Sequence, residues 1–270
     1  MVRSALYVPA SNARALEKAR GLDADMLIID LEDSVPDDGK VEARIAAVRE
    51  AKAGFPGKLL AIRINATDSP HVNDDIAAVA DARVDCFVLP KVNSDEGLDR
   101  IAQTLGKPLI AMIESPAGIY AARKIASNAA VAGLIAGAND FCAETGIRPG
   151  PNREGLELAL QSIVLAAAAA QIPAFDGVCN RLDDLTGFEA ECRQGRCYGF
   201  AGKTLIHPNQ IAPANLAFGP SAEDIADAEA MLQASKGGAQ RFRGRMIESM
   251  HVEAAQQLIL RAKSEGEAGG

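Results

Sequence analysis

Short apolar runs alternate with longer segments of helical character along most of the chain. The apolar runs predict eight strands, at residues 5–8, 26–31, 59–65, 86–89, 109–114, 131–136, 174–178 and 204–207. The segments between them predict helices at residues 12–20, 41–52, 73–83, 97–105, 119–127, 154–170 and 184–196. A strand–helix repeat of roughly 28 residues fits a parallel sheet, and eight such units predict an α/β protein with a closed (β/α)8 TIM barrel.

The chain continues beyond the eighth predicted strand. Ser221 and Asp224 have the spacing of a capping box and predict a helix over residues 221–235. The stretch "KGGAQRFRGRM" then breaks the pattern, a further helix is predicted over residues 249–263, and the tail "SEGEAGG" has the composition of a disordered segment. We predict a catalytic barrel domain at 1–220 and a C-terminal helical extension at 221–270, which packs on the barrel or contacts a neighbouring subunit.

Nearly every predicted strand ends in polar or special residues: "YVP", "DLED", "RIN", "LPK", "IES", "AND", "FDG" and "IHP". In an α/β barrel these strand ends form the catalytic face. In "LIIDLEDSV", Asp30 and Glu32 lie two residues apart and therefore share one face of the strand. Because unpaired buried carboxylates are costly, we interpret this pair as part of a site and not as a strand running out into solvent.

The same strand ends supply candidates for binding a metal and an anion. Glu114 and Asp140 follow neighbouring strands, and two carboxylates completed by water and substrate oxygens are the usual protein ligands of Mg²⁺. The alternative for each is a carboxylate that accepts a backbone N–H at a helix start. Arg63 needs either a protein carboxylate or an anionic substrate as its partner. His207 follows the last strand, and Lys91 could instead form a Schiff base, which the nearby acids disfavour.

The composition and charge of the chain exclude some classes of partner and indicate a cellular compartment. A net charge of −8 argues against general nucleic-acid binding, and the longest apolar run, residues 163–170, is too short to span a membrane. We see no signal peptide, and five cysteines without a CxxC pair fit reduced thiols. We therefore expect a cytoplasmic protein with no nucleic-acid or membrane partner. The motifs GxSxG, HExxH and GxGxxG are absent, and "GFAGKT" lacks the first glycine of a phosphate loop.

Several motifs, in order, resemble the HpcH/HpaI aldolase–citrate lyase superfamily: "SALYVPASNARALEKA", "DLEDSVPDDGKVEAR", "IRINA", "LPKV", "IESPAGI", "GANDF" and "GKTLIHPNQI". Within it the chain looks like the citrate lyase β-subunit-like branch, which includes malyl-CoA and citramalyl-CoA lyases. The resemblance implies a (β/α)8 barrel, a homotrimer, Mg²⁺ as cofactor, and acyl-CoA or acyl-carrier-protein thioester substrates.

The resemblance also implies roles for particular residues. Glu114 and Asp140 match the metal ligands, and Arg63 matches the arginine that binds the keto-acid carboxylate. Asp30 and Glu32 would support them by orienting metal-bound water or Arg63. The remaining matches are the CoA-site positions Tyr7, Arg14 and Lys18, and the substrate-contacting pair Ile206 and His207.

One departure concerns the C-terminal segment. Lyases of the family carry an Asp in a "GxMID"-like segment that enters the neighbouring subunit's site, whereas this chain has "GRMIES", with Glu248 at that position. Glutamate keeps the carboxylate but adds a methylene. A misplacement of about 1 Å can cost on the order of 100-fold in rate. We still expect Glu248 to act in proton transfer.

The function that we expect is Mg²⁺-dependent carbon–carbon lyase chemistry, in which a 3-hydroxy-acyl-CoA thioester is cleaved to an acyl-CoA and a 2-keto acid, or formed from them. One alternative is a citrate lyase β-type subunit that acts only with an acyl-carrier-protein partner. Others are a CoA-independent pyruvate-type aldolase and a barrel that binds a keto acid for regulation. The sequence leaves open the particular thioester and the direction of the reaction.

Overall fold

The computed structural model describes residues 2–268, without the side chains of residues 261 and 263–268. The contacts between residues divide the described chain into two compact units, residues 2–215 and the segment from Leu216 onward. Each unit is described by itself. No helix within residues 2–268 is both long and apolar enough to cross a membrane.

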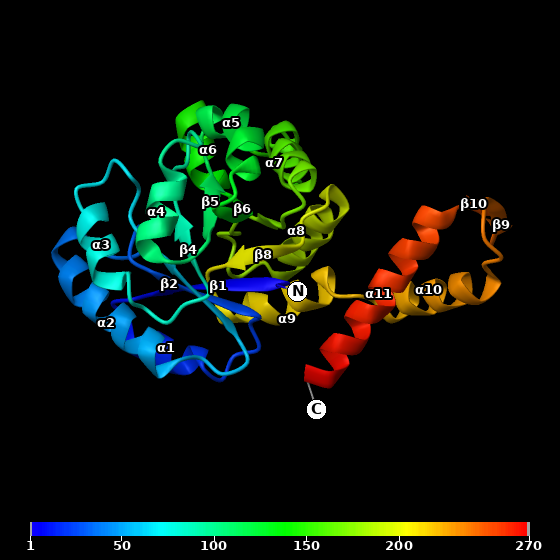
Figure 1. Cartoon of the computed structure of the whole chain (residues 1–270), viewed down its shortest axis with the longest axis horizontal. Helices are drawn as coiled ribbons and strands as arrows, with labels where there is room; N and C mark the ends of the chain where they lie inside the picture. The colour runs from blue at the N-terminus through cyan, green and yellow to red at the C-terminus, as the bar shows by residue number, and fades with distance from the viewer. Residues whose placement is uncertain (1, 269–270) are drawn as a thin grey trace. The chain divides into compact units, whose positions relative to one another are not determined.

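The first unit is a closed barrel of eight parallel strands, which pair in sequence order and close between β8 and β1 (Figure 1). The strands are β1 (Ser4–Pro9), β2 (Met26–Asp30), β3 (Leu59–Arg63), β4 (Cys86–Leu89), β5 (Leu109–Ile113), β6 (Val131–Ala136), β7 (Ala174–Asp176) and β8 (Gly202–Leu205). Each overlaps a strand predicted from the sequence, because the apolar runs are long enough to mark them. The predicted (β/α)8 barrel is confirmed.

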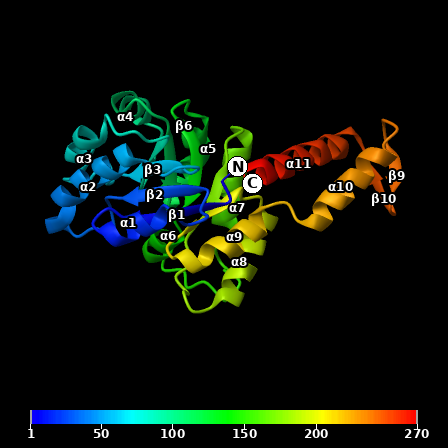
Figure 2. The ribbon, with the colours of Figure 1, turned by 90° about the horizontal axis from the view of Figure 1, so that it is seen from below.

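Helices lie outside the strands of this unit, as Figure 1 and Figure 2 show. They are α1 (Ala13–Ala19), α2 (Lys40–Ala53), α3 (Val72–Val79), α4 (Leu98–Leu105), α5 (Pro116–Ser127), α6 (Ala138–Thr145), α7 (Glu157–Ala169), α8 (Leu185–Tyr198) and α9 (Ile211–Phe218), with 3-10 turns η1 (Asp37–Gly39) and η2 (Pro208–Gln210). The sequence did not predict α6 or α9. Helix α6 buries none of its residues and so carries no apolar stripe, while α9 contains Pro213 in its first turn, where a proline is tolerated.

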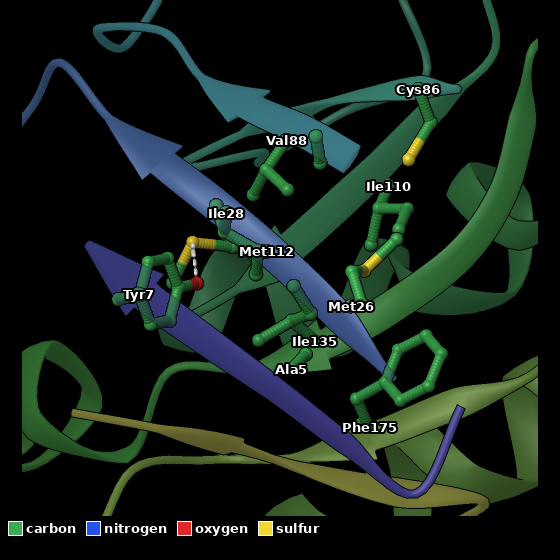
Figure 3. Packing of buried hydrophobic residues seen from close by; sticks show 11 residues of the cluster. Ala5, Tyr7, Met26, Ile28, Cys86, Val88, Ile110, Met112, Ile135 and Phe175 are labelled. Atoms are coloured by element: carbon green, nitrogen blue, oxygen red, sulfur yellow. Dashed lines mark hydrogen bonds between the residues drawn. The ribbon is translucent and has the colours of Figure 1, made fainter. Parts of the chain in front are cut away.

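The interior of the barrel is filled by apolar side chains from β1 to β7 (Figure 3). Alternate residues of each strand point inward, such as Ala5 and Tyr7 on β1, or Ile110 and Met112 on β5. Because this core occupies the middle of the barrel, polar side chains that follow the strands collect at the strand ends. The fold therefore places Arg63 and the acids Asp30, Glu32 and Glu114 at the carboxyl ends of the strands.

The second unit comprises α10 (Ala222–Ala234), a hairpin of β9 (Gln240–Phe242) and β10 (Arg245–Ile247), and α11 (Ser249–Ala268). The predicted capping box is confirmed, since the amide of Asp224 donates to Ser221 Oγ at 3.0 Å. The hairpin was missed. Its two-residue loop, Arg243 and Gly244, has positive φ angles of 46° and 83°, the geometry of a type I′ turn.

The second unit has a small core of its own, formed by Ala228, Met231, Phe242, Ile247 and Ala255. Helix α11 continues through Ala268, so the prediction of disorder is wrong for residues 264–268. Gly269 and Gly270, the rest of that predicted tail, lie outside the described residues.

Candidate active site

A cavity of about 390 Å³ opens at the carboxyl ends of the barrel strands. Its wall combines acidic, basic, amide and apolar groups from every strand end except that of β4. The lining residues are Tyr7, Pro9, Asp30, Asp33, Ser34, Arg63, Met112, Glu114, Ala136, Gly137, Ala138, Asn139, Asp140, Val178, Asn180, Thr204 and Ile206. Six of the residues predicted from the sequence meet here: Tyr7, Asp30, Arg63, Glu114, Asp140 and Ile206.

Arg63 is held on three sides. Its Nε and Nη2 donate to the two carboxylate oxygens of Asp30, each at 2.7 Å, and its Nη1 lies 2.9 Å from Oε2 of Glu32. The ring of Tyr7 stacks on the guanidinium, 4.7 Å from ring centre to Cζ. Figure 3 shows the Tyr7 hydroxyl donating to Met112 Sδ, at 3.5 Å. These contacts fix the plane of the guanidinium at the floor of the cavity.

The two acids beside Arg63 have opposite pKa shifts. Burial alone would raise the pKa of Asp30, but the hydrogen bonds and charge of Arg63 hold that pKa below its usual value. For Glu32, burial prevails over the attraction of Arg63 and Lys91, and its pKa is raised. Asp30 is therefore the ionised partner that fixes Arg63, whereas the carboxyl of Glu32 is less completely compensated.

Glu114 is a buried carboxylate that accepts one strong hydrogen bond. Its Oε1 accepts the backbone N–H of Lys91 at 2.5 Å. Burial, with the charges of Asp140 and Glu32, raises the pKa of Glu114 to about 7. Gly137, which begins the loop before α6, leaves the space for this side chain, because a Cβ there would overlap the Glu114 carboxylate.

The pair of Glu114 and Asp140 fits a divalent cation. The site holds five acids (Asp30, Glu32, Asp33, Glu114 and Asp140) against two cations, Arg63 and Lys91. Within residues 2–268 no three His, Cys, Asp or Glu side chains form a complete metal cage. Two carboxylates with open positions for water and substrate suit Mg²⁺, which keeps several waters and rarely uses an all-protein cage.

Five of the predicted residues lie outside the cavity wall. His207 is exposed and outside the cavity wall, where its Nδ1 accepts the amide of Asn209 at 3.3 Å and caps η2. Arg14 and Lys18 are exposed on α1, also outside the wall. Glu248 follows β10 in the second unit, with an exposed side chain. Glu32 is buried behind Arg63 and does not line the cavity.

Sequence reasoning missed a second set of wall residues. Asn139 and Asn180 come from the ends of β6 and β7, and their side-chain amides bond each other, with Nδ2 of Asn180 donating to Asn139 at 2.8 Å. Thr204 lines the wall beside them and donates to the carbonyl of Asp176 at 3.0 Å. Asn139 stands inside the quoted motif "GANDF" and could have been found from its position next to Asp140. Asn180 carries no signal of this kind.

The environment of Lys91 opposes a Schiff base. Its ammonium group lies 3.4 Å from Oε1 of Glu32. Although partial burial lowers its pKa, the charge and hydrogen bond of Glu32 prevail, and the pKa is raised. A lysine that attacks a carbonyl needs a neutral amine and hence a lowered pKa.

The fold and the site define a (β/α)8-barrel enzyme with an acidic pocket at the strand ends. The chain belongs to the HpcH/HpaI aldolase/citrate lyase family, whose model matches residues 3–208. It is 37% identical over 270 residues to a (3S)-malyl-CoA thioesterase of Cereibacter sphaeroides, covering 97% of this chain and 95% of the relative. It is 30% identical to the human mitochondrial citramalyl-CoA lyase, covering 97% and 86%.

Solved structures agree with this assignment. The CitE protein of Mycobacterium tuberculosis, in complex with magnesium, acetoacetate and coenzyme A, superposes with a TM-score of 0.84 at 30% identity, covering 96% of this chain and 97% of that one. The predicted family is confirmed, and the protein is an enzyme of a carbon–carbon lyase family. Magnesium, the predicted cofactor, is bound in this neighbour.

Proposed function

We propose that the protein is a Mg²⁺-dependent carbon–carbon lyase that cleaves a 3-hydroxy-acyl-CoA thioester to an acyl-CoA and a 2-keto acid, or joins them. The observation that carries the proposal is one cavity that holds both a fixed guanidinium, Arg63, and a pair of carboxylates, Glu114 and Asp140. A keto acid needs both, a cation for its oxygens and a donor for its carboxylate.

In this proposal Glu114 and Asp140 hold the cation, which, when bound, polarises the keto-acid oxygen and neutralises charge that develops on it. Arg63 binds the carboxylate of the same half through the N–H groups that Asp30 does not use, those of Nη1 and the second N–H of Nη2. The bond between the hydroxyl-bearing carbon and the thioester α-carbon breaks after the hydroxyl loses its proton. Its electron pair forms the thioester enolate, which then takes up a proton at the α-carbon.

We propose Glu248 as the group that delivers this last proton, from the second unit of a neighbouring subunit in a homotrimer. Its exposed carboxylate and the preserved "GRM" before it support this role. Glu248→Gln removes the titratable proton at nearly constant size, so we expect at least about a tenfold loss of turnover with little change in KM. Full activity in that variant would assign the proton transfer to another group.

The thioester end is proposed to leave the cavity past β1 and α1. Arg14 and Lys18 are four residues apart on α1, so they share a helix face and can both reach phosphate groups. We propose acyl-CoA as the carrier, with a carrier-protein thioester as the alternative. The relatives named citrate lyase subunit beta keep that alternative open, such as the Haemophilus influenzae protein, 33% identical over 284 residues. The cytoplasmic location remains a prediction from the sequence.

A second candidate is hydrolysis of a malyl-CoA-type thioester. The 37% identity to a (3S)-malyl-CoA thioesterase, over nearly the whole of both chains, favours it. The two reactions differ in their products, because hydrolysis releases free CoA thiol and the hydroxy acid, whereas lyase chemistry releases an acyl-CoA and a keto acid.

The test is a Mg²⁺-dependent assay of the purified chain with malyl-CoA, citramalyl-CoA and 3-methylmalyl-CoA. Keto acid is detected with phenylhydrazine and free thiol with a thiol reagent, in separate reactions. Keto acid formed with Mg²⁺ and lost with EDTA supports the lyase, and thiol without keto acid supports the hydrolase. Neither product from any ester would contradict both, and a repeat with acyl-carrier-protein thioesters would then test the subunit alternative.

A further inference from the structure

Lys91 stands in an unusual backbone conformation directly after β4. Its φ of +53° lies in the left-handed region, which residues other than glycine rarely adopt. Its backbone N–H donates to Glu114 Oε1 at 2.5 Å, and the next amide, that of Val92, donates to the carbonyl of Met112 at 3.1 Å. Two hydrogen bonds to β5 and the residue after it therefore fix this turn and the direction in which the lysine side chain leaves it.

The side chain of Lys91 lies next to that of Glu32. Its Nζ lies 3.4 Å from Oε1 of Glu32, and the other oxygen of that carboxyl lies 2.9 Å from Nη1 of Arg63. Glu32 is 5% exposed, and its Oε2 makes no hydrogen bond of good geometry. One buried carboxyl thus stands between two cations and is fully satisfied by neither.

Arg63 has a limited number of free donors. Nε and one N–H of Nη2 are used by Asp30, so a substrate carboxylate must be bound at the edge formed by Nη1 and the rest of Nη2. Glu32 faces that edge at Nη1. It is therefore a built-in competitor for the nitrogen that the substrate needs, and its strength as a competitor depends on what else compensates its charge.

We propose that Lys91 is a positioning residue that competes with Arg63 for Glu32, and so weakens the hold of Glu32 on the Nη1 edge that the substrate carboxylate must occupy. This inference rests on the carboxylate-binding role proposed for Arg63. It assigns Lys91 a task that involves neither a covalent bond to substrate nor contact with it. The lysine acts through Glu32, so removing the charge of Glu32 should make the lysine dispensable.

The experiment measures binding of pyruvate, a simple 2-keto acid, by calorimetry in the presence of Mg²⁺. The variants are Lys91→Met, Lys91→Arg, Glu32→Gln and the double variant Lys91→Met/Glu32→Gln. Lys107→Met, at an exposed lysine just before β5, is the matched control. Thermal unfolding of each variant shows that it is folded. KM and kcat for the thioester substrate are measured beside the pyruvate Kd.

We expect Lys91→Met to weaken pyruvate binding about tenfold and to raise KM similarly with little change in kcat. Lys91→Arg and the double variant should lie within about threefold of wild type, because the charge is kept in one and the competitor is neutral in the other. A merely structural lysine would not be rescued by Glu32→Gln. Wild-type affinity in Lys91→Met, or a double variant as weak as Lys91→Met, would overturn the proposal.

The outcomes separate this inference from the proposed function. Wild-type protein that binds pyruvate with the expected pattern of variants, yet turns over no thioester, would contradict the lyase and leave the role of Lys91 standing. Thioester turnover with no effect of Lys91→Met on Kd or KM would do the reverse. A wild type that binds no pyruvate in the presence of Mg²⁺ would overturn the carboxylate role of Arg63 and this inference with it.

Discussion

Two clusters of charged side chains in the barrel unit have a similar composition but differ in how completely their members pair with one another. The mouth cluster, Asp30, Glu32, Arg63 and Lys91, lies at the strand ends of the ≈390 Å³ cavity, where Asp30 and Arg63 line the wall. The closed cluster, Arg153, Asp176, Glu191 and Lys203, joins β7 and β8 to α8 and lines no part of that cavity. Each contains two acids and two bases.

The charged groups of the closed cluster are hydrogen-bonded mainly to one another. Lys203 is 0% exposed, and its ammonium group donates to Asp176 at 2.9 Å, to Glu191 at 2.8 Å and to the carbonyl of Gly177 at 2.5 Å, so its three hydrogens are all used. Arg153 donates from Nη1 to both oxygens of Asp176, at 2.7 and 2.9 Å. The ammonium hydrogens of Lys203 and both oxygens of Asp176 are therefore used within the protein.

The mouth cluster leaves groups unsatisfied. Oε2 of Glu32 lacks a well-formed hydrogen bond although Nη1 of Arg63 lies 2.9 Å away, and Glu114 beside them has a pKa of about 7. Buried ions that complete one another's hydrogen bonds stabilise a fold, whereas an incomplete set marks the place that a ligand completes. The predictions below test this distinction.

The largest effect is expected from breaking the closed cluster. Lys203→Met removes a buried cation and leaves Asp176 and Glu191 without their shared partner, which we expect to cost about 3–5 kcal/mol of unfolding free energy. Urea denaturation measures it, with the exposed Lys107→Met as control. A loss below about 1 kcal/mol would show that the cluster contributes little to stability.

The next effect concerns metal binding at the mouth. Glu114→Gln and Asp140→Asn should each weaken Mg²⁺ binding about a hundredfold, or roughly 2.7 kcal/mol, without loss of folding stability, because each removes charge repulsion. Calorimetry with Mg²⁺ is the measurement. Glu144→Gln, an exposed acid one turn later on α6, is the matched control. Unchanged Mg²⁺ affinity in either variant would reject that residue as a ligand.

The same substitution, arginine to lysine, can be made in both clusters. Arg63→Lys and Arg153→Lys each break a two-oxygen contact to a buried aspartate, so both should lose about 1–2 kcal/mol of stability. Only Arg63→Lys should also weaken pyruvate binding, by about tenfold. Paired calorimetry and urea denaturation separate the effects. Equal pyruvate binding in the two variants would mean that Arg63 does not contact the carboxylate.

The sequence predicted the barrel well because the strand signals are local. Apolar runs bounded by polar ends need no knowledge of partners, and all eight overlap the observed strands. What local patterns could not supply was the hairpin after α10 and helix α6, whose short lengths carry too little periodicity. The left-handed turn at Lys91 also has no residue signature, since glycine is the usual marker and is absent there.

The polar strand ends contain acids that line the cavity and also an acid that is paired inside the protein. Asp30 and Asp176 both follow apolar runs and look alike in the sequence, yet Asp176 is fully paired with Lys203, 27 residues away, and with Arg153. Whether a strand-end carboxylate is paired within the protein depends on such distant partners. Sequence reasoning dismissed "GFAGKT" as a phosphate loop, correctly, but had no means of seeing that its lysine neutralises an acid on the neighbouring strand.

The smallest effect is a pH dependence that the closed cluster should impose. Burial alone would raise the pKa of Asp176, but Lys203 and Arg153 hold it below its usual value, so its contribution to stability is present above about pH 4 and is lost as the pH falls. The pKa of Lys203 is raised by Asp176 and Glu191 against the effect of burial, so its contribution is present below about pH 10 and is lost as the pH rises.

The contribution of this pair to stability should therefore be level between these limits and fall on both sides. In Lys203→Met the fall of stability at basic pH should become smaller, because the lysine that titrates there is gone. The fall of stability at acid pH should become smaller as well. Asp176 then keeps only Arg153 as its cation, so the pKa of Asp176 lies closer to its value in the unfolded chain. Urea midpoints measured across pH for wild type and variant test this. Parallel curves for the two proteins would show that Lys203 and Asp176 do not titrate as a pair, and that the closed cluster is held by packing alone.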